Sequence, residues 1–112
     1  MLAMLMGVKN ISPAELQARL DSAPPIVIDL NAPHSWQAAR VPGAISLGVD
    51  FAPSSLPADQ GASLVFYCSN PLCSKAPRAA RRAGKLGYTD VRVMSAGISG
   101  WLAASLPVDS GA

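Results

Sequence analysis

The two cysteines of the chain, Cys68 and Cys73, lie in one short segment. Cys68 directly follows the apolar, β-forming residues 64–67, and an alanine-rich stretch typical of a helix begins at Ser74. A cysteine between a buried strand and the first turn of a helix faces unpaired N–H groups and the positive end of the helix dipole. Because both favour a thiolate, we expect the pKa of Cys68 to be lowered and its thiol to be a nucleophile.

The spacing of the cysteines limits the chemistry that they can support. A structural metal site takes four ligands, and beyond Cys68 and Cys73 the sequence offers one histidine, His34, and no second cysteine pair. Two cysteines in one loop are also not the disulfide framework of a small secreted fold. We therefore expect no metal site, and we interpret a local disulfide between these thiols as redox chemistry.

Composition and charge predict a compact domain without a nucleic-acid partner. Of 112 residues, 50% are hydrophobic and 14% are charged, and the net charge is only +2. The basic residues are unevenly placed, because five follow Cys68 in the expected helix: Lys75, Arg78, Arg81, Arg82 and Lys85. They form either a local positive field that suits an anionic substrate or a solvated helix face.

Expected strands and helices alternate along the chain. Strands are predicted at residues 8–11, 26–28, 44–47, 62–67 and 91–94, and helices at residues 12–20, 33–40, 74–86 and 98–104. Residues 48–61 are predicted to be a loop with one helical turn. The alternation predicts an α/β fold with a parallel sheet and right-handed crossovers. Ligands bind at the carboxyl ends of such strands, where Asp29 and Cys68 both lie.

Several other side chains have structural interpretations. Asp29 either bonds to backbone amides of the Cys68 loop or caps the following helix, and a structural role is the favoured interpretation. Strand alternation directs Tyr67 to the face opposite Cys68. We expect Trp36 and Trp101 to anchor the core, and His34 to lie on a helix surface.

The first seven residues are apolar but too few to span a membrane, and they lack the basic start of a signal peptide. We expect them to be an extension that precedes a single domain at residues 8–112. The expected location is the cytoplasm, with no membrane partner.

Over nearly its full length the chain resembles the rhodanese-like family of sulfurtransferases. Three blocks carry the resemblance. The first is Val27-Ile-Asp-Leu-Asn followed by Trp36-Gln-Ala-Ala-Arg-Val-Pro-Gly-Ala-Ile, and the second is Phe66-Tyr-Cys68 with the helix ending Gly87-Tyr-Thr-Asp-Val. The third is Met94-Ser-Ala-Gly-Ile-Ser-Gly-Trp101. Each block is weak alone, but their order and separation are specific. The resemblance implies a three-layer α/β/α fold with a central, mostly parallel sheet.

The resemblance also implies an activity and a site. In the family, the cysteine that maps to Cys68 accepts a sulfane sulfur from a donor such as thiosulfate and passes it to cyanide or a thiol. Backbone amides of the loop hold the sulfur, without a cofactor. Here this loop comprises Ser69, Asn70, Pro71, Leu72, Cys73 and Ser74. Related phosphatases and arsenate reductases have a loop one residue longer that closes with arginine, and neither Cys73 nor Ser74 is arginine, so a phosphatase is disfavoured.

The chain departs from the family pattern at four positions. The usual residues are replaced by Asn31, Arg40, Pro71 and Cys73. Pro71 removes one amide from the loop. Cys73 stands where an arginine is usual, so Lys75 or Arg78 is the candidate to hold the charge of the donor.

Cys73 itself has two interpretations. It is either a resolving thiol that displaces sulfide from a Cys68 persulfide, leaving a disulfide for a thioredoxin-type reductant, or a small residue that fills space under the loop. We favour the second, because a tight loop directs side chains outward. The alternatives to a sulfurtransferase are a non-catalytic binding or sulfur-relay module and a thiol redox protein that uses Cys68 and Cys73.

Overall fold

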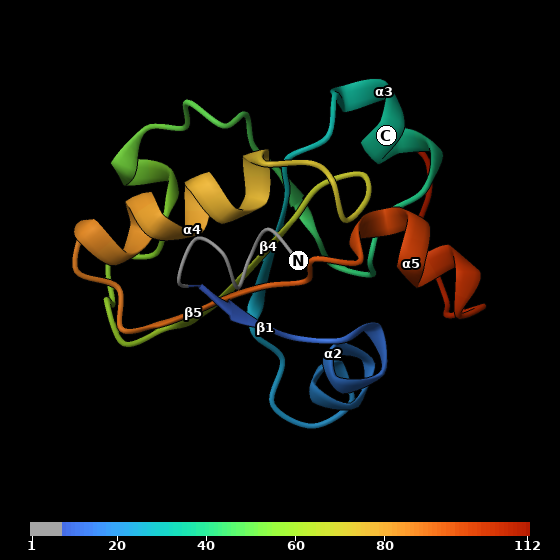
Figure 1. Ribbon diagram of the computed structural model, residues 1–112, viewed down its shortest axis with the longest axis horizontal. Coiled ribbons are helices and arrows are strands. Elements are labelled where there is room, and N and C mark those ends of the chain that lie inside the picture. Colours follow the sequence, from blue (N-terminus) through green and yellow to red (C-terminus); the bar gives the residue numbers. More distant parts are fainter. Residues whose placement is uncertain (1–7) are drawn as a thin grey trace.

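The computed structural model describes residues 8–112, which form a five-stranded sheet with helices on both faces (Figure 1). The elements are β1 (Lys9–Asn10), α2 (Pro13–Leu20), β2 (Ile26–Asp29), α3 (Pro33–Ala38), β3 (Ile45–Ser46), a 3-10 turn (Pro53–Ser55), β4 (Ser63–Tyr67), α4 (Lys75–Lys85), β5 (Asp90–Val93) and α5 (Gly97–Ala103). The strand order is β1-β5-β4-β2-β3, and every neighbouring pair is parallel. The predicted α/β fold is confirmed, and the predicted extension at residues 1–7 lies outside the described residues.

Alternation along the strands divides the core into two parts. In β2, Val27 belongs to one cluster of buried side chains and Ile28 to the other; in β4, Tyr67 and Phe66 divide in the same way. Both central strands are therefore covered on both faces, which is why their sequences are apolar runs rather than alternating patterns.

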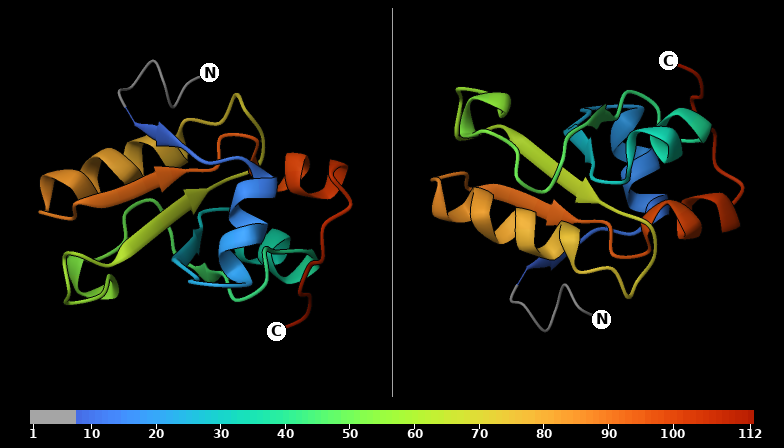
Figure 2. Two further views of the ribbon diagram at one scale, coloured as in Figure 1. Left: turned by 90° about the horizontal axis from the view of Figure 1, so that it is seen from below. Right: turned by 90° about the horizontal axis from the view of Figure 1, so that it is seen from above.

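Helix α4 covers one face of the sheet through small side chains. Ala76, Ala79, Ala80 and Ala83 are all buried. They pack with Phe66 and its neighbours in one apolar cluster. Because alanine is small, this contact brings the axis of α4 close to β4 and β5, and the views of Figure 2 show α4 lying along these strands. The helix start is thereby held next to the end of β4.

Helices α2 and α5 cover the other face. Leu16 of α2 and Trp101 of α5 are fully buried with Val65 and Met94. Complete burial of a side chain such as Leu16 contributes about 1.5–3 kcal/mol. The position of α5 is thus fixed against the same strand that ends at Cys68.

The predicted helix boundaries are confirmed at two ends. The Ser12 hydroxyl accepts from the Glu15 amide at 3.1 Å, and the Glu15 carboxylate accepts from the Ser12 amide at 3.0 Å. This reciprocal capping box starts α2. After α4, Gly87 has φ of +106°, the left-handed geometry that ends a helix at glycine.

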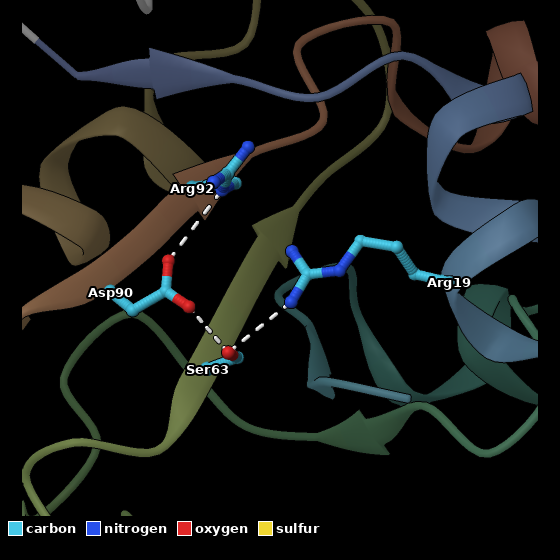
Figure 3. A network of polar contacts seen from close by, with 4 residues as sticks. All are labelled: Arg19, Ser63, Asp90 and Arg92. Carbon is cyan, nitrogen blue, oxygen red and sulfur yellow. Dashed lines mark hydrogen bonds and ion pairs between the residues drawn. The ribbon is translucent and has the colours of Figure 1, made fainter. Parts of the chain in front are cut away.

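A polar network lies at the amino ends of β4 and β5, opposite to Cys68 (Figure 3). Arg19 of α2 donates to the Ser63 hydroxyl at 3.2 Å, and Ser63 donates to Asp90. Asp90 also pairs with Arg92, with 3.5 Å between nitrogen and oxygen. The Ser63 hydrogen bond, more than the nearby arginines, holds the pKa of Asp90 below its usual value. This network joins α2 to the sheet.

The prediction that Trp36 anchors the core is wrong. Trp36 is only half-buried, its indole N–H donates to the Ala44 carbonyl at 2.9 Å, and the Arg40 guanidinium lies 3.8 Å from its ring centroid. The reason is that α3 buries none of its residues. Trp101 is a core residue and His34 is exposed, as predicted. No helix within residues 8–112 is long and apolar enough to cross a membrane.

Candidate active site

Cys68 immediately follows β4, at the carboxyl edge of the sheet. It is 3% exposed and belongs to the apolar cluster under α4, whereas Tyr67 belongs to the cluster on the opposite face. The alternation that predicted these opposite directions is therefore confirmed for this pair. The Cys68 sulfur faces the start of α4.

The start of α5 fixes the backbone of Cys68 and Ser69. The Ile98 amide donates to the Cys68 carbonyl at 2.9 Å, and the Ser99 amide donates to the Ser69 carbonyl at 3.0 Å. Gly97 has φ of +67°, and a Cβ at this position would lie 2.6 Å from the Ser69 carbonyl carbon. Only glycine allows α5 to approach the loop this closely.

The outer part of the loop is held by Asn70. Its side-chain oxygen accepts from the Leu72 amide at 2.9 Å, and its carbonyl accepts from the Cys73 amide at 3.1 Å. Pro71 has no amide, and Leu72 at the tip is 86% exposed. Asn70 therefore engages two amides of the loop, those of Leu72 and Cys73.

The donors that face the sulfurs come from the start of the loop and the start of α4. The amides of Ser69 and Ala76 act to lower the pKa of Cys68, and the amides of Ser69 and Lys75 act to lower the pKa of Cys73. Ser74 is the N-cap of α4, but its side chain makes no capping bond. The unpaired first-turn amides are consequently available to sulfur.

The expected lowering of the pKa of Cys68 is wrong. Burial is the largest effect and, together with the neighbouring Cys73 thiol, raises the pKa of Cys68 to about 12, although the Ala76 and Ser69 amides oppose this. Burial also disfavours the thiolate of Cys73. Hydrogen bonds from the Cys68 thiol, the Lys75 amide and Ser69 outweigh it, so the pKa of Cys73 is lowered. The two neighbouring thiols therefore titrate as a pair.

Cys73 is turned inward, the position expected of a small residue that fills space under the loop, whereas the expectation that a tight loop directs side chains outward is wrong. It is half-buried and packs against the apolar cluster that contains Cys68. The Cys68 thiol donates to the Cys73 carbonyl oxygen, with 3.7 Å between sulfur and oxygen, and each thiol affects the pKa of the other. The Asn70 turn explains this direction, because it folds residue 73 back toward the sheet. Both cysteines are free thiols.

Asp29 supports the strand ends and makes neither of the predicted contacts. It is fully buried; one carboxylate oxygen accepts from the Asn31 amide at 2.8 Å and the other from the Tyr67 hydroxyl at 2.5 Å. Tyr67 in turn accepts from the Val41 amide at 3.1 Å. Burial, the largest effect, raises the pKa of Asp29. The cap of α3 is Ala32, without a side-chain hydrogen bond.

The two basic candidates lie in different surroundings. Lys75 lines a pocket of about 250 Å³ at the carboxyl ends of β2 and β3, together with Leu30, Asn31, Leu47 and others. The Leu30 amide donates to the Tyr67 carbonyl at 2.9 Å, so this pocket lies beside the strand end that leads to Cys68. Arg78 instead lines a separate surface hollow with Arg81, Arg82 and Lys85.

Sequence reasoning missed the groups that build the site from outside the loop. These are the amides of Ile98 and Ser99 and the close approach at Gly97, whereas first-turn amides of the helix after Cys68, such as that of Ala76, were expected. The glycine-containing turn before α5 is the signal that marks such an approach. Nothing in the side chains at positions 98 and 99 marks their amides.

The chain is similar to known proteins in sequence and in structure. The family model "Rhodanese-like domain" matches residues 12–104. The HTH-type transcriptional regulator Rv0324 of Mycobacterium tuberculosis is 33% identical over 103 residues, which are 91% of this chain and 45% of the regulator. The thiosulfate sulfurtransferase GlpE of Pseudoalteromonas translucida is 28% identical over 100 residues, which are 88% of this chain and 93% of that protein. A thiosulfate sulfurtransferase structure from Pseudomonas aeruginosa is similar with a TM-score of 0.82 and 26% identity, covering 93% of this chain and 20% of that one. The chain thus spans less than half of the regulator and nearly all of GlpE.

Proposed function

Because the chain belongs to the rhodanese-like domain family, we propose that it is a sulfurtransferase in which Cys68 carries a sulfane sulfur as a persulfide. The observation that carries the proposal is the position of Cys68, which follows β4 directly and lies beside the start of α4, where the Ser69 and Ala76 amides act to lower its pKa. Such amides favour negative charge on a sulfur without a general base. The likeness to GlpE supports thiosulfate as the donor.

The two thiols together supply the nucleophile. Loss of one proton from the Cys68–Cys73 pair leaves one negative charge, and exchange of the remaining proton between the two neighbouring thiols places this charge on Cys68. The Cys68 thiolate attacks the sulfane sulfur of thiosulfate, and sulfite leaves with the electron pair of the broken S–S bond. Cyanide or a thiolate then attacks the outer sulfur, and the Cys68 thiolate leaves.

The pocket beside Lys75 is the proposed approach for the anionic donor. Lys75 is exposed and borders both this pocket and the loop, whereas Arg81 lies two turns further along α4. We expect Lys75→Gln to raise KM for thiosulfate several-fold with a small effect on kcat, as for a lost binding charge. Arg81→Gln is the matched control and leaves KM within about twofold.

Turnover tests the proposal. Thiocyanate formation from thiosulfate and cyanide is measured for wild type, Cys68→Ser and Cys73→Ser. We expect Cys68→Ser to abolish turnover, because Cys68 is the attacking group. Cys73→Ser should retain turnover at least in part, because Cys68 remains and loses the neighbouring thiol that raises its pKa. Turnover that persists in Cys68→Ser contradicts the proposal.

A second candidate is a sulfur-binding module within a larger protein. It is favoured by the match to an HTH-type transcriptional regulator, of which this chain covers only 45%. In that case Cys68 still takes up a sulfur, but wild type gives no multiple turnover with either cyanide or thiols.

A further inference from the structure

We infer that Cys73 is a resolving thiol, which displaces the outer sulfur of the Cys68 persulfide as sulfide and closes a Cys68–Cys73 disulfide. This inference rests on the proposed function, because it needs a persulfide on Cys68. It assigns the same site a second outcome besides transfer to an external acceptor.

The first observation is the direction of Cys73. Its side chain is turned into the site and packs against the cluster that contains Cys68, and the Cys68 sulfur lies 3.7 Å from the Cys73 carbonyl oxygen. The Cys73 amide is held by the Asn70 carbonyl at 3.1 Å, so the loop already maintains this direction. A disulfide requires the sulfurs to close to about 2 Å, and a preformed contact leaves little of that approach to be made.

The second observation is the shared set of amides around both sulfurs. The Ser69 amide acts to lower the pKa of both thiols. The Lys75 amide acts on Cys73 in the same way, and the Ala76 amide acts on Cys68. The pKa of Cys73 is lowered against the effect of burial, first by the Cys68 side chain and then by the Lys75 and Ser69 amides. Cys73 is therefore the member of the pair that is ready to attack as a thiolate.

The chemical step is balanced within the site. The Cys73 thiolate attacks the inner sulfur of the Cys68 persulfide, the bond between the inner and outer sulfurs breaks, and the outer sulfur leaves with the electron pair as hydrosulfide. The sulfane sulfur is thereby reduced by two electrons, and the two cysteines are oxidised to a disulfide. An external dithiol must reduce this disulfide before the next cycle.

The solvent exposure of the two disulfide sulfurs determines which of them the reducing dithiol attacks. Cys68 is 3% exposed, while Cys73 is partly exposed beside Leu72 at the open tip of the loop. An incoming thiolate therefore reaches the Cys73 sulfur first and forms a mixed disulfide there. The Cys68 thiolate then leaves toward the Ala76 amide.

A single-turnover experiment on the full chain tests the inference. Reduced protein is loaded with thiosulfate, freed of small molecules and kept without any thiol, while sulfide and intact mass are followed. Wild type is expected to release about one sulfide per chain and to become about 2 Da lighter than the reduced protein. Cys73→Ser and Cys73→Ala are expected to keep the added sulfur, about 32 Da, and to release sulfide at least about 100-fold more slowly.

A displaced thiol is the matched control. The double variant Leu72→Cys, Cys73→Ser keeps two cysteines in the loop but moves the second thiol to the exposed tip. We expect it to release sulfide as slowly as Cys73→Ser. Adding cyanide at the end shows that every loaded variant still yields thiocyanate.

The outcomes separate the two proposals. If wild type retains its persulfide with a free Cys73, or if Cys73→Ser releases sulfide at the wild-type rate, the resolving role is overturned while the persulfide on Cys68 stands. If no variant gains a sulfur, the proposed function fails and the resolving role fails with it.

Discussion

Replacement of Gly97 by alanine tests how the site is positioned, because this glycine is where α5 contacts the Cys68 loop. A Cβ on residue 97 would lie 2.6 Å from the Ser69 carbonyl carbon and 2.7 Å from the Asn70 nitrogen. Backbone atoms cannot turn away as a flexible side chain can. The Ser69 backbone must therefore move away from residue 97. This movement lengthens or breaks the hydrogen bonds that the Ile98 and Ser99 amides donate to this part of the loop.

The cost of Gly97→Ala has two parts. Holding alanine at φ of +67° costs roughly 1–2 kcal/mol. The overlap requires a retreat of about 0.8 Å to reach ordinary contact, and overpacking of this kind costs about 1–3 kcal/mol. The free energy of unfolding should fall by roughly 2–5 kcal/mol, which most domains survive because they begin at about 5–15 kcal/mol.

Gly43→Ala is the matched control. Gly43 also has positive φ, +81°, but a Cβ there meets nothing within 4 Å. Gly43→Ala should lower the free energy of unfolding by only about 1–2 kcal/mol. Unfolding in urea measures stability, and the rate of Cys68 alkylation measures the site in the folded proteins. We expect Gly97→Ala alone to change the alkylation rate of Cys68 by several-fold, because the sulfur loses its alignment with the amides of α4.

Equal stability and equal Cys68 reactivity of Gly97→Ala and Gly43→Ala would contradict this prediction. If Gly97→Ala costs no more stability than Gly43→Ala and leaves the reactivity of Cys68 unchanged, the close approach of α5 does not position the loop.

Three further predictions concern stability. Tyr67→Phe leaves the Asp29 carboxylate and the Val41 amide without their buried partner, so unfolding in urea should show a loss of about 1–3 kcal/mol. Burial raises the pKa of Asp29 above its ordinary 3.8, so the folded protein binds this proton more tightly than the unfolded chain does. Relative to Asp29→Asn, the unfolding free energy of wild type should therefore fall as pH rises from about 4 through the folded pKa, and a difference that does not vary with pH contradicts this. Gly84→Ala, within α4 and with nothing within 4 Å of the new Cβ, should raise the thermal midpoint through a gain of about 0.5–1 kcal/mol.

Much of the fold could be predicted because its signals are local. The capping pair of Ser12 and Glu15 fixes the start of α2, and Gly87 fixes the end of α4. The apolar run of β2 indicates a strand covered on both faces, as Val27 and Ile28 show by joining different clusters. The family resemblance supplied the order of the layers.

The site was predicted less well because its energetics depend on contacts between distant segments. The pKa of Cys68 depends on burial under α4 and on the inward turn of Cys73, and neither is encoded in the loop sequence alone. The role of Asp29 depends on Tyr67, 38 residues away. The donors from α5 are backbone amides, whose positions do not depend on the identity of their side chains.

The most direct test of the account is to locate the sulfur after loading with thiosulfate. Cys73→Ser, which is expected to retain the persulfide, is loaded, alkylated and digested, and peptides are analysed by mass. We predict an added sulfur of about 32 Da on the peptide that contains Cys68, and its removal when cyanide is added before alkylation. An unmodified Cys68 peptide in protein that remains folded would contradict the central claim that Cys68 carries sulfane sulfur.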